Sequence, residues 1–197
     1  MSHELRTPLN SILLLSRLMA ENKDKTLSKD LVEYAQVIQS SGNGLLELID
    51  EILDLSKIEA GKMELDYSYL PIKEVIADMR MLFGPLAREK GVLFLFDEDP
   101  EMVTEIETDR MRLEQILKNL LSNAFKFTKS GSISVHIKRD SQNDDRFILF
   151  EVKDTGIGIP EDKLGLIFEA FQQADGSTKR KYGGTGLGLS ISRELSR

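Results

Sequence analysis

The chain contains no cysteine among its 197 residues. Disulfide bonds and thiolate metal sites are therefore excluded, and a reducing cytoplasm is the expected compartment. Tryptophan is also absent, and only two histidines occur, His3 and His136. Because histidine is so scarce, the placement of each one needs a physical explanation.

Long apolar runs are missing as well. Near the start of the chain the longest run is Ile12–Leu15, which is far too short to span a bilayer, and no signal-peptide pattern is present. An excess of positive charge is also missing, since the net charge is −7, and this argues against a nucleic-acid partner. The remaining composition, 41% apolar and 30% charged, is typical of a soluble globular protein with a core.

The first third of the chain has the pattern of two helices. Apolar and small residues recur at alternating spacings of four and three, as in a heptad repeat. They are Leu5, Leu9, Ile12, Ser16 and Met19, followed after a polar link by Leu31, Ala35, Ile38, Gly42, Leu45, Ile49, Ile52 and Ser56. The second helix is expected from Ser28 to Glu59, before Gly61 as terminator. Two such helices cannot bury both stripes alone, so we expect a dimer that forms a four-helix bundle.

Beyond residue 61 the pattern mixes strands and helices. Extended chain is expected at 63–70, and strands are expected at Val92–Phe96, Ser132–Lys138 and Phe147–Val152. Helices are expected at Pro71–Lys90, Asp109–Phe127 and Glu161–Phe171 and from Leu189 onward, after a glycine-rich loop at Ala174–Gly188. The predicted fold class is therefore α+β, with a helical hairpin at residues 1–66 and an α/β domain at 67–197.

His3 lies on the polar side of the first predicted helix. At about 100° per residue it is nearly opposite the apolar stripe and on the same side as Thr7, so it is not a core residue. A zinc site of the His-Glu-x-x-His type would need an imidazole where Thr7 stands. A solvated polar face and a nucleophile both remain open. His136 occupies the polar side of an alternating strand and is assigned to a solvated surface.

Asparagine is unexpectedly frequent on one face of the predicted helix Asp109–Phe127. Asn119 and Asn123 are one turn apart there, and Lys126 follows on the same face. A merely solvated face would favour Glu and Lys, because Asn is a mediocre helix former. Amide oxygens suit Mg²⁺, which keeps several waters and bridges phosphates, and a lysine can meet a phosphate as a point charge.

Two glycine-rich segments follow. Asp154 follows the predicted strand Phe147–Val152 and can accept hydrogen bonds from an amino group, while Gly156 and Gly158 permit a close backbone approach; an ordinary turn is the alternative. Further on, Gly183, Gly184, Gly186 and Gly188 lead into a helix N-terminus, which presents amide N–H groups to anions. The spacing is not that of a Rossmann fingerprint, and no Walker A motif occurs.

Five segments, in their order along the chain, resemble the boxes of sensor histidine kinases of two-component systems. SHELRTPLN resembles the H box, NLLSNAFKFT the N box, DTGIGIP the G1 box, IFEAFQQAD the F box and YGGTGLGLS the G2 box. Each motif alone is weak or moderate, but five in order are highly specific. The resemblance covers nearly the whole chain.

The resemblance implies a dimeric phosphotransfer hairpin followed by an ATP-binding α/β sandwich of the GHKL type. It implies that His3 is the phosphoacceptor, that Glu4 orients or deprotonates its imidazole, and that Thr7 positions water when the partner is dephosphorylated. ATP and Mg²⁺ are the implied cofactors, with Asn119 and Asn123 as metal ligands. The implied nucleotide contacts are Asn119, Asn123, Lys126, Phe127, Asp154, Gly156, Gly158, Arg180, Gly184, Thr185, Gly186, Leu187 and Gly188.

The expected function is that of an ATP-dependent protein-histidine kinase. It would autophosphorylate His3, pass the phosphoryl group to an aspartate of a response-regulator receiver domain, and act as a phosphatase for that partner. A nucleotide-binding dimerisation module without phosphotransfer is the alternative. A gyrase-like or chaperone-like ATPase is disfavoured by the His-Glu-x-x-Thr pattern of the hairpin. Family members extend beyond both ends, so we expect a piece of a longer protein, truncated after residue 197, whose membrane anchor, if any, lies upstream.

Overall fold

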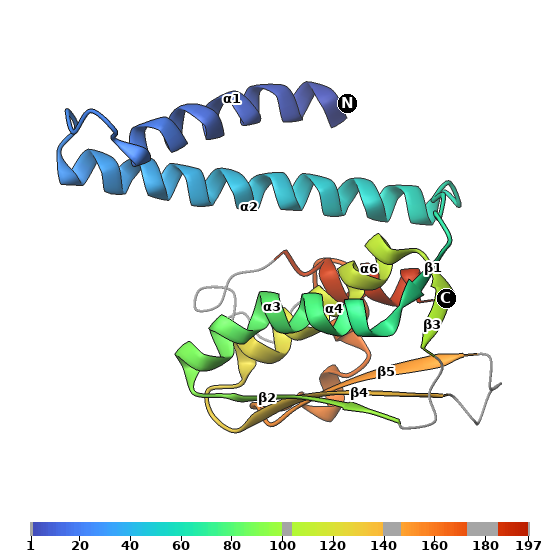
Figure 1. Cartoon of the computed structure of the whole chain (residues 1–197). Coiled ribbons are helices and arrows are strands. Elements are labelled where there is room, and N and C mark those ends of the chain that lie inside the picture. The colour runs from blue at the N-terminus through green and yellow to red at the C-terminus, as the bar shows by residue number, and fades with distance from the viewer. Residues whose placement is uncertain (1, 100–103, 140–146, 173–184, 197) are drawn as a thin grey trace. The chain divides into compact units, whose positions relative to one another are not determined.

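The computed structural model describes residues 2–99, 104–139, 147–172 and 185–196, with the side chains of residues 2 and 3 left out. The chain divides into two compact units, Met1–Met63 and Glu64–Arg197 (Figure 1). The first is a helical hairpin and the second an α/β sandwich, so the predicted fold class is confirmed. No helix in the described part of the chain has both the length and the apolar composition needed to cross a membrane.

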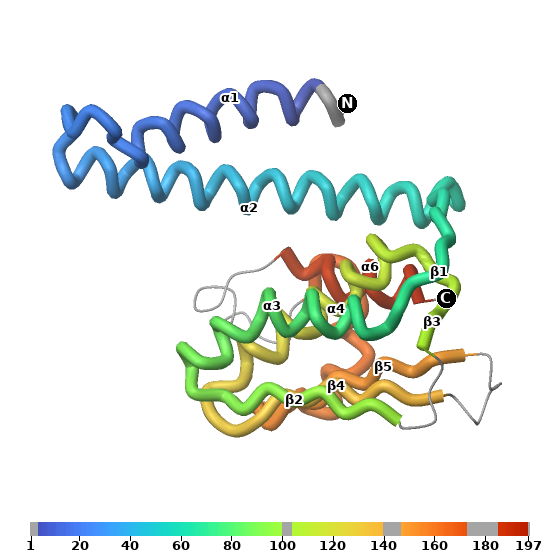
Figure 2. The backbone as a smooth tube through the Cα atoms, viewed as in Figure 1, coloured from blue at the N-terminus to red at the C-terminus, as the bar shows by residue number. Residues whose placement is uncertain are grey.

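The hairpin consists of α1 (Ser2–Glu21) and α2 (Lys29–Glu59), which run antiparallel (Figure 2). Its turn is closed by Asn22, which has a φ of 39° and whose amide exchanges two 3.1 Å hydrogen bonds with the backbone of Leu27. Ser28 then caps α2 by accepting a hydrogen bond from the Leu31 N–H. Asparagine tolerates the left-handed conformation, and serine is a favoured N-cap, so these residues explain where the chain reverses.

The heptad stripe divides into two halves in the hairpin. Leu9, Ser16 and Ala35 are buried between the helices. Gly42 also faces this interface, since a Cβ there would lie 2.8 Å from Cδ2 of Leu13. The alternate positions remain 40–54% exposed; they are Leu5, Ile12, Met19, Leu31, Ile38, Leu45 and Ile52. One hairpin therefore buries only one half of the stripe.

The second unit has helices on one face of a mixed sheet (Figure 1). The sheet has the order β2 (Leu93–Glu98), β4 (Ser132–Arg139), β5 (Ile148–Asp154); β2 is parallel and β5 antiparallel to β4. A separate antiparallel pair is formed by β1 (Ser68–Pro71) and β3 (Glu105–Thr108). The helices are α3 (Ile72–Lys90), α4 (Arg110–Phe127) and α6 (Gly188–Leu195).

The core of this unit lies between the sheet and the helices. The ring of Phe125 stacks on Phe83 with centroids 5.4 Å apart, and it meets Phe94 edge-on at 5.2 Å. Strand β4 contributes Ile133, Val135 and Ile137, all at most 2% exposed, as its strict alternation predicted. This core fixes α4 relative to β4 and β5. Strand β5 leads directly into the G1 segment.

Asp109 begins α4 and ties it to the preceding chain. One carboxylate oxygen accepts from the Arg112 N–H and the other from the Asp66 N–H, both at 3.0 Å. Burial by itself would raise the pKa of Asp109, but these backbone hydrogen bonds and the charge of Arg112 hold the pKa below its usual value. The cap is therefore ionised at neutral pH.

The prediction of one helix over Glu161–Phe171 is wrong, because the segment forms two short 3₁₀ helices, η1 (Glu161–Lys163) and η2 (Leu166–Phe168). Gly165 lies between them, and its conformational freedom disfavours a continuous helix. The apolar residues of the segment also remain exposed among the described residues, with Leu164 at 49% and Phe171 at 62%, so burial does not stabilise a longer helix. Strand β3, only four residues long, was not predicted.

Candidate nucleotide site and phosphoacceptor helix

The N-box asparagines lie on the face of α4 that meets α6. Leu117, Leu121 and Ala124 on α4 are buried in the core. Asn119 and Asn123 lie on another side of the helix, half-buried, and Nδ2 of Asn123 donates to Oδ1 of Asn119 over 3.4 Å. The two amides therefore form one polar group at the junction of the helices.

The start of α6 packs directly on this amide pair. A Cβ on Gly188 would overlap the side-chain amide of Asn119, so only glycine permits the observed approach. Gly186 has a φ of 75°, and its carbonyl accepts a hydrogen bond from the Phe171 N–H at 3.0 Å. The N–H groups of the first turn of a helix lack intrahelical partners and favour anions. The site thus combines such a turn with amide oxygens.

Lys126 brings positive charge to the last turn of α4. It is half-buried, its Nζ lies 5.1 Å from the ring centroid of Phe127, and burial lowers the pKa of its ammonium group. A cation that has lost part of its hydration gains more from an incoming anion than a fully solvated one does. Lys126 is therefore suited to a phosphate group.

Asp154 is held at the end of β5 by two hydrogen bonds to the same oxygen. Its Oδ1 accepts from the Gly156 N–H at 2.8 Å and from Oγ1 of Thr128 at 3.4 Å. A Cβ on Gly156 would lie 2.7 Å from the carbonyl oxygen of Phe127, so glycine is required where the G1 segment crosses the end of α4. These contacts bring the N-box and G1 residues together.

Sequence reasoning missed two threonines that hold this turn. Thr128 follows α4 and is fully buried beneath Asp154. Oγ1 of Thr155 accepts from the Ser132 N–H at 3.0 Å, which joins the G1 turn to β4. Both residues lie within or beside the boxes, but threonine is common in turns and gave no signal that distinguished them.

The phosphoacceptor motif belongs to the first turns of α1 in the other unit. His3 is part of this helix, but its side chain lies outside the described residues. Glu4 and Thr7 are described and exposed. Pro8 lies inside the helix and lacks the N–H that would donate to the Glu4 carbonyl. Nearby, Arg6 forms a 2.6 Å ion pair with Asp50, which joins this end of α1 to α2.

Some predicted contacts lie outside the described residues, namely Arg180 and Gly184. Of the remaining G2 residues, Leu187 is fully buried, and its N–H donates to Oγ1 of Thr185 at 3.3 Å. Gly158 has a φ of 70°. The structure therefore assembles the N-box residues with Asp154, Gly156 and the start of α6, whereas Arg180 and the first residues of the G2 box lie outside the described residues.

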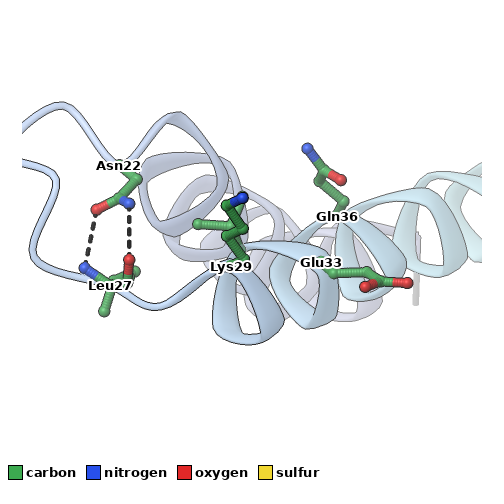
Figure 3. A pocket seen from close by; sticks show the side chains of 6 residues that line it. Asn22, Leu27, Lys29, Glu33 and Gln36 are labelled. Atoms are coloured by element: carbon green, nitrogen blue, oxygen red, sulfur yellow. Dashed lines mark hydrogen bonds between the residues drawn. The ribbon is translucent and has the colours of Figure 1, made fainter.

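A separate hollow of 470 Å³ lies at the turn of the hairpin (Figure 3). It is lined by Asn22, Leu27, Lys29, Val32, Glu33 and Gln36. Asn22 and Leu27 are engaged in the hydrogen bonds that close the turn, and the hollow is at the opposite end of α1 from His3. It is therefore a feature of the turn rather than part of the phosphoacceptor site.

The metal-ligand atoms that this site offers suit a magnesium ion that is bound mainly through substrate phosphates. Among the described residues no group of three histidines or carboxylates could hold a metal ion. Two neutral amide oxygens beside a helix N-terminus offer few ligands and no negative charge. Mg²⁺ binds in this way, through one or two protein oxygens, several waters and substrate phosphates.

Two family profiles match the chain. Residues 1–61 match the His Kinase A (phospho-acceptor) domain, and residues 108–197 match the Histidine kinase-, DNA gyrase B-, and HSP90-like ATPase family. The chain is 40% identical over 195 residues to the autoinducer 2 sensor kinase/phosphatase LuxQ of Vibrio cholerae. That match covers 99% of this chain and 22% of LuxQ, so the chain spans about a fifth of this relative's length.

Solved structures of histidine kinases also resemble the chain. Full-length ShkA in complex with AMPPNP superposes with a TM-score of 0.82 at 34% identity, over 99% of this chain and 39% of ShkA. The catalytic domain of histidine kinase ThkA gives a TM-score of 0.55 at 30% identity, over 66% of this chain and 79% of that domain. The structure of ThkA in complex with the response regulator TrrA gives a TM-score of 0.61 at 27% identity, over 98% of this chain and 51% of the matched chain.

Proposed function

This chain belongs to the sensor histidine kinase family, and we propose that it transfers the γ-phosphoryl group of ATP to His3. One observation supports the proposal: the Asn119 amide accepts a hydrogen bond from Asn123 and lies against Gly188, the first residue of α6. Together these groups would suit a metal-bound polyphosphate. A nucleotide-binding dimerisation module without phosphotransfer would need the same site but no phosphoacceptor. The phosphoacceptor motif on α1 supplies the nucleophile.

The nucleotide is held at two ends in this proposal. Asp154 accepts a hydrogen bond from the adenine amino group through Oδ2, because Oδ1 is already occupied by Gly156 and Thr128. Lys126 and the first-turn N–H groups of α6 bind the phosphates. Asn119 and Asn123 hold Mg²⁺, which, when bound, neutralises charge on the phosphates and aligns them.

The transfer itself is a displacement at phosphorus. A neutral imidazole nitrogen of His3 attacks the γ-phosphorus, the nitrogen–phosphorus bond forms, and the bond from phosphorus to the ADP oxygen breaks. Histidine, with a usual pKa of about 6.5, is largely neutral at physiological pH, so it carries a free lone pair. Glu4, next to His3 in the first turn, orients the ring and takes its proton.

The phosphorylated histidine then donates to a partner. We expect the acceptor to be an aspartate of a response-regulator receiver domain; the complex of the similar kinase ThkA with a response regulator supports this. Thr7, exposed one turn after His3, positions the water that removes phosphate from that partner. The designation of LuxQ as a sensor kinase/phosphatase supports the second activity.

The chemical stability of the label tests the reaction class. The chain is incubated with γ-labelled ATP and Mg²⁺, and the labelled protein is treated with acid and with alkali. A phosphohistidine is a phosphoramidate, so we expect the label to be lost in acid and kept in alkali. Label that survives acid indicates a phosphoserine or phosphothreonine and contradicts the proposal.

A further inference from the structure

A buried serine on α6 contacts the asparagine that the proposed function assigns to the metal. Nδ2 of Asn119 donates to Oγ of Ser192 over 2.8 Å, and Ser192 is only 7% exposed. The two residues are 73 positions apart in the chain. The hydrogen bond therefore forms only when α6 is docked on α4.

This contact anchors the Asn119 amide, while the Asn123 amide beside it sets which end faces the proposed metal site, because a serine hydroxyl can bind either end of an amide. An asparagine amide carries an oxygen and an NH₂ group that exchange places when the group rotates by half a turn, and only the oxygen can ligate a cation. With Nδ2 committed to Ser192, Oδ1 lies on the other side, 3.4 Å from Nδ2 of Asn123 and against Gly188. The reversed amide would place its NH₂ group against the NH₂ group of Asn123.

We propose that Ser192 is a positioning residue of the metal–phosphate site, which anchors the Asn119 amide beside Asn123 and the start of α6. The inference rests on the proposed function, since it takes Asn119 as a ligand of Mg²⁺. Ser192 itself touches neither metal nor nucleotide. Without its hydroxyl, the Asn119 side chain loses this anchor and can leave the position from which its oxygen would reach the metal.

The test separates metal binding from nucleotide binding. ATP affinity of the 197-residue chain is measured by calorimetry with Mg²⁺ and with EDTA, and the ratio of the two affinities is the readout. In Ser192→Ala we expect this ratio to fall by about two- to tenfold, the equivalent of one net hydrogen bond. The affinity measured in EDTA should stay within about twofold of the unmutated chain, because Ser192 does not contact the nucleotide.

Two further variants distinguish positioning from a loss of packing. Ser190→Ala removes another buried hydroxyl of α6, one that donates to the Leu187 carbonyl at 2.7 Å instead of contacting Asn119. Its affinity ratio should equal that of the unmutated chain, whatever the change in thermal stability. Ser192→Thr keeps the hydroxyl and should restore the ratio lost in Ser192→Ala.

The contrary outcomes are distinct. An unchanged ratio in Ser192→Ala, or an equal fall in Ser190→Ala, overturns the role of Ser192 and leaves the proposed function intact. An unmutated chain that binds ATP equally well with Mg²⁺ and with EDTA overturns the magnesium assignment, and this inference fails with it.

Discussion

Asp154 has one carboxylate oxygen occupied and one available among the described residues. Gly156 and Thr128 both donate to Oδ1, so an adenine amino group would bind Oδ2. Asn in place of Asp keeps the shape but has a single accepting oxygen, so either the Gly156 N–H or the ligand then faces an NH₂ group. The contact is therefore sensitive to the replacement of one carboxylate oxygen by an NH₂ group.

We predict that Asp154→Asn lowers ATP affinity by about 10- to 100-fold, as expected for a hydrogen bond to a charged group. GTP binding should be weak in the unmutated chain and change little, because guanine has a carbonyl where adenine has its amino group. Calorimetric titration with both nucleotides measures this, with Glu151→Gln as the control on an exposed position of the same strand. Equal affinities for ATP and GTP before mutation would refute the assignment.

Lys126 gives the site a pH dependence. Burial lowers the pKa of its ammonium group below the ordinary 10.5, and bound phosphates raise it again by favouring the charged form. Above the pKa that Lys126 has in the nucleotide-free chain, ATP binding must therefore take up a proton, so the affinity for ATP falls as the pH rises. We predict this decline as the pH rises toward the ordinary 10.5, together with proton uptake in buffers of different ionisation enthalpy.

Lys126→Met should bind ATP about 10- to 100-fold more weakly at neutral pH and should lose the alkaline decline. If the variant keeps the same pH profile as the unmutated chain, another group is responsible, and Lys126 does not bind phosphate.

At the scale of elements, the α-helices were predictable and the shortest elements were not. The stripe from Leu31 to Ser56 repeats over many turns, so its period is unambiguous, and α2 ends close to the predicted Glu59. Strand β3 and the 3₁₀ helices have three or four residues each, too few to show a period. Their conformation depends on pairing with β1 and on Gly165, which are tertiary and local effects.

The residues of the proposed site could be identified from the sequence to a similar degree. Asn119, Asn123 and Asp154 belong to motifs whose residue types indicate their chemistry. The residues that hold them, Thr128 and Ser192, act through contacts to partners 26 and 73 positions away. Spacing along one chain carries no information about such distant partners, so the supporting residues appear only in the folded structure.

Two glycines of α2 provide a matched test of the hairpin packing. Gly42 faces Leu13, where a Cβ would be 2.8 Å from Cδ2, whereas a Cβ on Gly44 would meet nothing within 4 Å. Gly44→Ala should raise the free energy of unfolding by about 0.5–1 kcal/mol, because alanine favours helix. Gly42→Ala should be less stable than Gly44→Ala by about 1–3 kcal/mol, the usual cost of overpacking.

Urea unfolding followed by helical circular dichroism measures both variants at one protein concentration. If Gly42→Ala is stabilised as much as Gly44→Ala, then α1 and α2 do not approach each other as closely at Leu13 as the structure indicates.

At the scale of the whole molecule, the exposed half of the heptad stripe predicts a second copy as partner. Seven stripe residues remain 40–54% exposed along α1 and α2, although their spacing is that of a packed seam. A symmetric dimer would bury them against the same residues of the partner subunit. We therefore expect the hairpin to form half of a dimeric four-helix bundle.

We predict that Leu45→Glu raises the dimer dissociation constant by at least about tenfold, because each copy would bury a charge in the seam. Ser40→Glu adds the same charge at an exposed position outside the stripe and should leave the constant unchanged. Sedimentation over a concentration series measures both. Equal effects of the two substitutions, or a monomeric unmutated chain, would rule out the stripe as the dimer seam.

The identity of the phosphoacceptor is the central claim, and the scarcity of histidine makes it directly testable. The chain has only His3 and His136, and the latter lies on β4, where its ring contacts Asp97 and Ser134. The measurement is the incorporation of acid-labile label from γ-labelled ATP into the unmutated chain, His3→Gln and His136→Gln, with ATP binding checked in each. We predict that His3→Gln binds ATP but takes up no label, while His136→Gln is labelled like the unmutated chain. Label retained in His3→Gln, or lost only in His136→Gln, would contradict the account.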